Sequence, residues 1–288
     1  MKLSALYELA KTAFGNWLTD YAPSMGAALA YYTVFSIAPL LVIVIAAAAV
    51  IFGQDAAQAA IIGQASGLIG EKGAAAIESM LASAQKPREG MIASALGIVI
   101  LIVGATTVFA ELETNLNRVW KVEADKGSGL WHFLRTRLLA FGMVLAIGFL
   151  LIVSLVVGAG IAAWGKYWSG WFGGLEILLQ AANFMVSVTV ITVMFAMIYK
   201  FIPRAPIRWR DVWIGALVTS LLFSLGKFLI GIYIGKAGVE SSYGAAGALA
   251  VILIWVYYSA QIFLLGAEFT KVYAESHGSR ATNDATVR

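Results

Sequence analysis

Residues that could carry enzyme chemistry are few in this chain of 288 amino acids. Its two histidines, His132 and His277, have no metal-ligating partner three or four residues further on. The sequence contains no cysteine, which excludes disulfides, thiolate metal sites and thiol nucleophiles. It also lacks the HExxH, GxSxG and P-loop patterns of zinc, acyl-transfer and nucleotide chemistry. We therefore expect a protein that is not an enzyme and that has neither a cofactor nor a metal site.

Polar residues inside long apolar runs are more informative, because ionisable groups are costly at membrane depth and usually face the interior of a helix bundle. Helical spacing places Tyr257, Gln261 and Glu268 on one face of the run 246–270. Other stripes at such spacing are Ser220, Ser224, Lys227 and Gly231; Thr107, Glu111, Asn115 and Arg118; and Tyr32, Thr33 and Ser36, followed by Pro39. These stripes either line a polar cavity between helices or form hydrogen bonds that hold helices together.

The elements that must position these residues are long apolar runs. Hydrophobic residues make up 60% of the chain and charged residues only 12%, against about 25% charged in a soluble domain. About 20 apolar residues cross a bilayer as a helix, the form in which the backbone satisfies its own hydrogen bonds. Six runs meet this requirement: 25–52, 91–110, 138–163, 177–199, 212–235 and 246–270. The sequence therefore predicts an all-α, polytopic membrane protein with six transmembrane helices.

The segments between and around these runs predict further helices. Residues 3–21 alternate apolar and charged faces, which is typical of a helix in the membrane interface. The segment 53–89 predicts a cap of two short helices split at 70–73. We expect one membrane domain over 1–275, without a cleavable signal peptide, and a polar, disordered tail over 276–288.

The last two runs predict an antiparallel hairpin, because only a short polar segment joins them. Small residues let helix backbones approach closely in a membrane. Gly231 and Gly235 on the first helix, with Gly244 and Ala248 on the second, have the four-residue spacing of such a contact. We therefore expect these positions to hold the hairpin together.

Orientation follows from the lysines and arginines in the loops. With six spans, 14 of them fall on the side that contains both termini and 5 on the other side. The positive-inside rule then predicts cytoplasmic N- and C-termini. The formal net charge of +4 is explained by this bias, so we expect no nucleic-acid partner.

The charged residues of these stripes are expected at different depths in the membrane. Lys227 comes 15 residues after the expected cytoplasmic start of its helix, about 22 Å into the membrane. There it either lines an outward-opening cavity that binds an anionic group or extends along the lipid face to the interface. Glu268 falls near the cytoplasmic boundary, about 33 Å from the outer start of its helix. We expect an inner charged cluster of Glu111, Glu268, Arg118, Arg204 and Arg208.

Short motifs in matching order connect the chain to a known family over about residues 10–275. They are 28–40 (ALAYYTVFSIAPL), 115–120 (NLNRVW), 201–203 (FIP), 213–217 (WIGAL), 243–247 (YGAAG), 255–258 (WVYY) and 264–268 (LLGAE). Through these motifs the chain resembles the YihY/BrkB family of bacterial inner-membrane proteins. The resemblance implies six spans with both termini inside. Family members have carried the labels ribonuclease BN, virulence factor BrkB and transporter.

Residues and resemblance together favour a transporter or flippase-like protein of the bacterial inner membrane, for a lipid-like or small polar solute. Without an ATP site, transport would be passive, ion-coupled or dependent on a partner. The alternative is an envelope scaffold that does not transport and binds partners through the 53–89 cap. Ribonuclease is a distant third, because no carboxylate cluster or histidine pair suits phosphodiester chemistry outside the membrane.

We expect membrane lipids as partners, and a homo-oligomer is compatible with the sequence. The residues expected to line a substrate pathway combine motif positions, the polar face of the last run and one membrane-embedded lysine. They are Tyr32, Ser36, Pro39, Glu111, Asn115, Lys227, Tyr243, Gly244, Tyr257, Gln261 and Glu268.

Overall fold

A computed structural model of the chain describes residues 3–84, 91–122, 130–168, 175–236 and 247–280. Within these ranges the chain forms helices joined by turns, and no strand is present. The helices are α1 (Leu3–Thr19), α2 (Ala22–Phe52), α3 (Gln54–Ala84), α4 (Met91–Val119), α5 (Leu130–Trp168), α6 (Leu175–Phe201), α7 (Trp209–Lys236) and α9 (Gly247–Ser276). The predicted all-α fold class is confirmed.

Five of these helices are long and apolar enough to cross a membrane. The qualifying segments are Ala22–Val50, Leu138–Ile161, Leu179–Phe201, Trp209–Tyr233 and Leu249–Ser276, in α2, α5, α6, α7 and α9. The predicted run 91–110 lies in α4, which is not among the five found in the described residues. The structure thus supports a multi-pass membrane protein, and the count of six spans is not confirmed.

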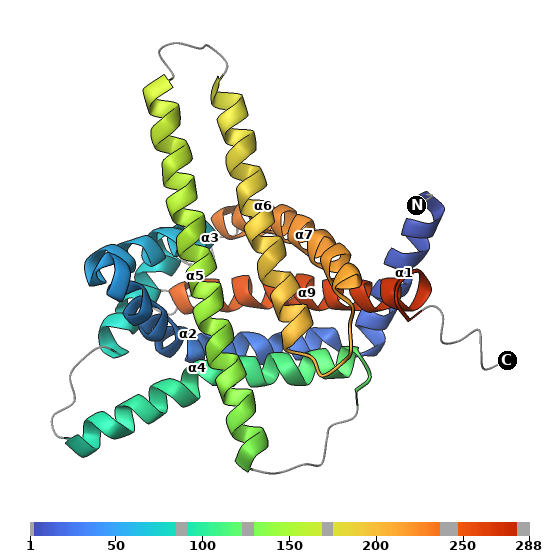
Figure 1. The fold of residues 1–288 in the computed structure, drawn as a ribbon, viewed down its shortest axis with the longest axis horizontal. Helices are drawn as coiled ribbons and strands as arrows, with labels where there is room; N and C mark the ends of the chain where they lie inside the picture. The colour runs from blue at the N-terminus through green and yellow to red at the C-terminus, as the bar shows by residue number, and fades with distance from the viewer. Residues whose placement is uncertain (1–2, 85–90, 123–129, 169–174, 237–246, 281–288) are drawn as a thin grey trace.

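Helix α9 runs through the middle of the molecule and contacts elements along its whole length (Figure 1). At its C-terminal end, Leu9 of α1 packs in a buried cluster with Phe269. At its N-terminal end, Ile69 and Ile77 of α3 pack with Ile252. The helices α2 and α7 lie against the part of α9 between these two ends. The two ends of α9 are therefore held by different elements, α1 at one and α3 at the other.

The contact between α7 and α9 is built on glycines. A Cβ atom added to Gly215 would lie 1.8 Å from Thr270 Oγ1, and one added to Gly266 would lie 2.0 Å from Thr219 Oγ1. A Cβ atom added to Gly226 would lie 2.3 Å from Ile262 Cδ1. The partners run in opposite sequence order along the two helices, so the helices are antiparallel. The predicted hairpin arrangement is therefore present.

The glycines that make this contact are not those predicted. A Cβ atom on Gly231 would meet nothing within 4 Å, and Gly231 is exposed. Gly226 lies 11 residues after Gly215, which is three helical turns and the same face, whereas Gly231 is displaced by about 140° from Gly226. The prediction for Gly231 is wrong, and Gly244 lies outside the described residues.

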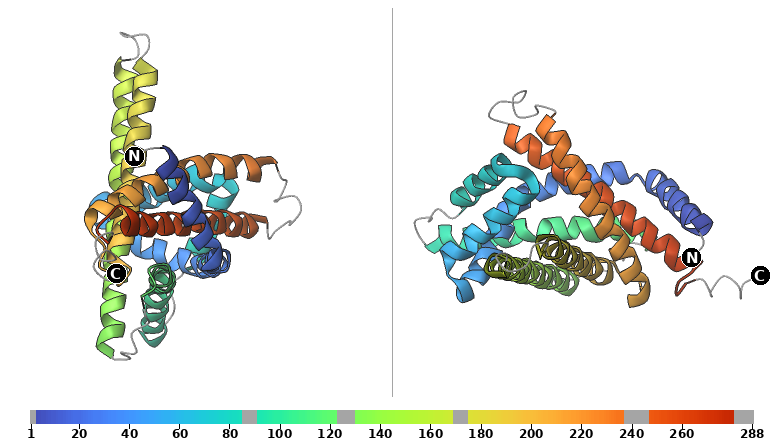
Figure 2. Two further views of the ribbon diagram at one scale, coloured as in Figure 1. Left: turned by 90° about the vertical axis from the view of Figure 1, so that its right-hand side faces the viewer. Right: turned by 90° about the horizontal axis from the view of Figure 1, so that it is seen from above.

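Helices α5 and α6 form a second antiparallel pair. They lie side by side and cross α2, α4 and α9 at a steep angle, so that one end of the pair projects beyond the other helices (Figures 1 and 2). Large apolar side chains are exposed along the pair: Leu138, Leu139, Phe149, Val156, Val157, Trp164, Phe184 and Met185. Such a surface is unfavourable in water and matches a hydrocarbon surrounding.

Helix α3 is divided at Gly70, whose φ of 81° and ψ of 169° are not helical. The split predicted at 70–73 is therefore confirmed. Gly53, between α2 and α3, has a φ of 81° as well. Residues with a side chain rarely adopt this conformation, so both ends of the first half of α3 depend on glycine. The described part of the predicted cap, residues 54–84, thus packs on α2 and α9 through two separate helices, and residues 85–89 lie outside the described residues.

Polar side chains inside the bundle partly serve to hold helices together. Tyr199 of α6 is fully buried, and its hydroxyl donates a hydrogen bond of 2.7 Å to the Phe263 carbonyl of α9. Ser220 of α7 and Thr192 of α6 join their hydroxyls at 2.7 Å. For Ser220 the structure therefore favours an interhelical hydrogen bond over a place in a polar cavity.

The first residues of the predicted tail are ordered. The buried carboxylate of Asp211, in the first turn of α7, accepts hydrogen bonds from the Ser279 backbone N–H (3.1 Å) and hydroxyl (2.6 Å). The Arg280 guanidinium lies 5.1 Å from the centre of the Trp120 ring. The expectation of disorder is wrong for the part of the tail described, up to residue 280, because Asp211 and Trp120 provide partners.

Candidate functional site

The polar stripe predicted on α9 becomes progressively more buried along the helix. Tyr257 is 39% exposed, Gln261 is half-buried and Glu268 is 0% exposed. Gln261 faces α2 at Gly26, where an added Cβ atom would lie 2.0 Å from Gln261 Nε2. The two amide atoms of Gln261 are buried and have no hydrogen-bond partner among the described residues. The stripe therefore leads from the surface to a fully buried carboxyl group.

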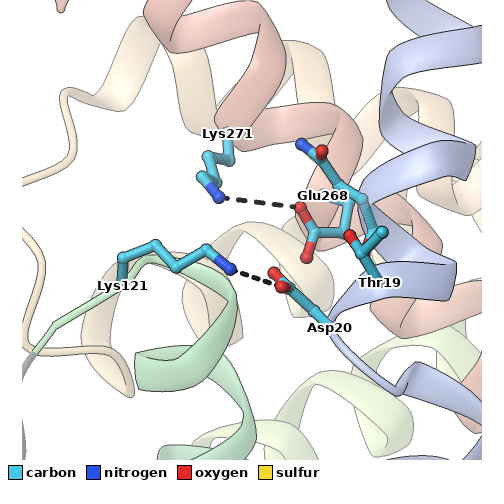
Figure 3. A network of polar contacts seen from close by, with 6 residues as sticks. Thr19, Asp20, Lys121, Glu268 and Lys271 are labelled. Carbon is cyan, nitrogen blue, oxygen red and sulfur yellow. Dashed lines mark hydrogen bonds and ion pairs between the residues drawn. The ribbon is translucent and has the colours of Figure 1, made fainter.

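Glu268 belongs to a network of four charged side chains (Figure 3). Asp20 follows the last residue of α1, Lys121 follows α4, and Lys271 stands one turn after Glu268 on α9. The Lys121 ammonium donates a hydrogen bond to Asp20 Oδ1. Lys271 Nζ lies 4.0 Å from Glu268 Oε2. Three separate parts of the chain thus place two acids and two bases together.

The charge of Asp20 is stabilised within this network. Burial of the carboxyl group opposes its ionisation. The hydrogen bond from Lys121 and the positive charges of Lys121 and Lys271 outweigh that effect and hold the pKa of Asp20 below its ordinary value of 3.8. Asp20 is therefore a carboxylate at neutral pH.

The charged cluster predicted around Glu268 has a different membership. Arg204 Nε donates to Glu113 Oε1 at 2.7 Å, and the Arg204 backbone N–H donates to Asn117 Oδ1 at 2.9 Å. The Arg118 guanidinium lies over the ring of Tyr21. The depth in the membrane estimated from the sequence predicted the correct end of the molecule for Arg204 and Arg118, but it could not predict their partners. The prediction that they surround Glu268 is wrong.

The other predicted pathway residues are distributed over the molecule. On α2, Tyr32 is exposed, Ser36 is buried, and Pro39 packs against Gly104 of α4. On α4, Asn115 is buried with its Nδ2 atom unpartnered in the described structure, and Glu111 is half-buried. Lys227 of α7 is exposed. Tyr243 and Gly244 lie outside the described residues.

A cavity of about 210 Å³ lies at the other end of α9, beneath the cap formed by α3. Its few polar groups are Thr33 of α2, Gln64 of α3 and the indole of Trp255 on α9, whose buried Nε1 has no partner in the described residues. The remaining lining is apolar: Ile37, Leu41, Ala60, Ile61, Ala65, Ile69, Ile77, Ile152, Ile252 and Val256. Trp255 precedes Glu268 by 13 residues, about 20 Å of helix, so cavity and charged network are separate.

Several of these residues were absent from the sequence-based set. Lys271 could have been found from its i+3 relation to Glu268. Asp20 and Lys121 are 101 residues apart and gave no such signal, because they meet only when the end of α1 and the end of α4 pack together. The lining of the cavity was missed because isoleucine and alanine in a membrane helix fit core, lipid surface and cavity equally well.

The fold and these contacts define a class: an all-α, multi-pass membrane protein with buried polar groups between its helices. The chain belongs to the virulence factor BrkB family, whose sequence profile matches residues 13–288. The predicted family membership is therefore confirmed.

Similar proteins from three bacteria are named UPF0761 membrane proteins. The relative from Verminephrobacter eiseniae is 27% identical over 91% of this chain and 61% of its own length. That from Ralstonia nicotianae is 30% identical over 92% of this chain and 58% of its own. That from Tolumonas auensis is 30% identical over 63% of this chain and 58% of its own. The chain thus spans about three fifths of the length of these relatives, and no solved structure matches it.

Proposed function

We propose that this protein is a transporter or flippase-like protein of the bacterial inner membrane, and that its solute is lipid-like. The observation that carries the proposal is the apolar cavity between α2, α9 and the α3 cap. Its side chains suit hydrocarbon, and Thr33, Gln64 and the Trp255 indole are available to a polar end. A small polar solute would leave most of this lining unused.

The size of the cavity limits what it holds. Its volume of about 210 Å³ is below the roughly 300–1,000 Å³ of sites that enclose a whole drug-sized ligand. A segment of an acyl chain would fit, with the rest of the lipid outside. The binding of one chain while a headgroup passes along the protein is the arrangement expected of a flippase-like protein.

The proposal includes an orientation. The ends of α1 and α9 lie at the same end of the molecule and α3 at the other (Figure 1), and the lysine and arginine bias puts the termini in the cytoplasm. Reporter fusions at Lys126 and at the C-terminus should therefore report cytoplasm, and a fusion at Gly70 should report the outside. A cytoplasmic reporter at Gly70 would overturn the orientation and the six-span count together.

Filling the cavity should stop lipid movement. Ala60→Phe places a ring in the cavity, whereas Ala59→Phe, one residue earlier on α3, puts the same ring on an exposed position. Both proteins would be reconstituted in phosphatidylethanolamine and phosphatidylglycerol vesicles that contain a trace of fluorescent phosphatidylethanolamine. Dithionite quenching reports the lipid that reaches the outer leaflet. We expect wild type and Ala59→Phe to move lipid and Ala60→Phe to lose about 90% of the rate or more, a tenfold decrease.

Equal rates for the two variants would show that the cavity is not on the lipid pathway. The scaffold alternative predicts something else: no lipid movement by the wild-type protein, and loss of cellular function only when residues 54–88 are deleted. Native mass spectrometry of the purified wild type and Ala60→Phe should show co-purified lipid on the first and less on the second. This readout tests binding in the cavity apart from movement.

A further inference from the structure

Three buried carboxyl oxygens at the charged network have no hydrogen-bond donor in the described residues: Asp20 Oδ2, Glu268 Oε1 and Glu268 Oε2. The other Asp20 oxygen is occupied by Lys121. Figure 3 shows the carboxyl groups of Asp20 and Glu268 turned toward each other. A buried acceptor without a donor is strongly unfavourable.

The neighbouring lysines do not remove this deficit. Lys271 Nζ is 4.0 Å from Glu268 Oε2, beyond the length of a hydrogen bond, although its charge favours ionised Glu268. Lys121 is directed at Asp20 and is largely solvent-exposed. Two ionised carboxyl groups in contact would also repel each other where water is excluded. Asp20, Lys121 and Lys271 are the charged groups that face Glu268 from the end of α1, the end of α4 and α9 itself.

We propose that Asp20 and Glu268 together form a binding site for one proton. Glu268 carries the proton and donates a hydrogen bond to Asp20 Oδ2, while Asp20 remains a carboxylate bound to Lys121. One proton thereby satisfies an oxygen on each residue and removes the repulsion between them. It also fixes the junction of α1 and α2 against α9. Loss of the proton would leave two facing carboxylates and weaken that contact. The site stands whether or not the protein moves a lipid.

Infrared spectroscopy tests the site without any transport assay. The full-length protein in lipid vesicles should show the C=O band of a protonated carboxylic acid at neutral pH, shifted in D₂O. Glu268→Gln should abolish this band. Glu275→Gln, on the same helix but exposed, should leave it unchanged. Asp20→Asn should shift the band, because it replaces the acceptor of the Glu268 hydrogen bond.

A second measurement covers the case in which Glu268→Gln does not fold. Dicyclohexylcarbodiimide modifies protonated carboxyl groups in apolar surroundings, and peptide mass spectrometry locates the adduct. In the wild-type protein we expect an adduct on Glu268 that falls as the pH rises from neutral to alkaline, and none on Glu275. A spectrum without a protonated-acid band at neutral pH, or a band that survives Glu268→Gln, would overturn the proposal. A Glu268 adduct independent of pH would overturn it too.

Discussion

Replacing Gly215 with alanine should destabilise the protein by about 1–3 kcal/mol, the usual range for overpacking a core. The added Cβ atom would lie 1.8 Å from Thr270 Oγ1 and 2.6 Å from Thr270 Cβ. Rotation of the threonine cannot clear its own Cβ, and it would break the hydrogen bond of 2.7 Å from Thr270 Oγ1 to the Gly266 carbonyl. The helices α7 and α9 must therefore separate. Thermal unfolding of the purified protein in detergent, followed by tryptophan fluorescence, measures the loss.

Gly231→Ala provides the matched control on the same helix. Nothing lies within 4 Å of the position of its added Cβ atom, so alanine should leave stability unchanged or raise it by up to about 1 kcal/mol through its helix propensity. The same substitution is thus expected to destabilise the protein at Gly215 and not at Gly231. Equal destabilisation by both variants would show that α7 and α9 do not contact through Gly215.

Lys121→Met should destabilise the protein at neutral pH by about 1.5–3 kcal/mol, the contribution of a hydrogen bond to a charged group. Asp20 is 8% exposed, and the variant leaves its carboxylate without the Lys121 donor. The side chain of Lys121 is 60% exposed, so the larger penalties of fully buried ion pairs do not apply. Lys11→Met, at an exposed position on α1, should change stability little.

The effect of Lys121→Met should disappear in acid. The pKa of Asp20 is lower in the folded protein than its ordinary value of 3.8. Its stabilising contribution is therefore complete above that value and is lost as the pH falls through the folded-state pKa. The stability difference between wild type and variant should begin to shrink as the pH falls below about 4, and it should vanish only below the folded-state pKa of Asp20. In the background of Asp20→Asn, Lys121→Met should have little effect. A penalty that persists in acid would mean that the lysine acts through the packing of its alkyl chain.

Apolar run lengths predicted the helices because the bilayer imposes them. The runs 138–163, 177–199 and 212–235 all lie within single helices. The helix ends were harder to predict: α4 continues to Val119 and α9 to Ser276, beyond the apolar residues. Hydropathy does not detect a helix that continues into a polar region. Local backbone chemistry was more informative at Gly70, where the glycine at the predicted split has the positive φ that ends one helix and starts another.

The candidate site was predictable only in part. Glu268 could be selected from the sequence as a site residue, because a carboxyl group within an apolar run is energetically costly and marks a candidate functional site. Its partners Asp20 and Lys121 lie outside the apolar runs, where charge is ordinary. Gly215 and Gly226 are three turns apart and were passed over in favour of Gly231 and Gly235, which have the familiar four-residue spacing. Spacing identifies a face of a helix, but the neighbour of that face depends on the whole packing.

The alternation of small and bulky residues between α7 and α9 limits how the molecule moves. If α9 slid by one turn, Gly215 would come opposite Gly266 and Thr219 opposite Ile262, which produces a hole beside a clash. The helices α7 and α9 therefore cannot slide along each other by one turn without losing this packing. The first half of α3 has no such alternating packing described along it; instead, it has a glycine with positive φ at each end, Gly53 and Gly70. The wall of the cavity formed by residues 54–69 is thus the one that is joined to the rest of the fold by a glycine at each end.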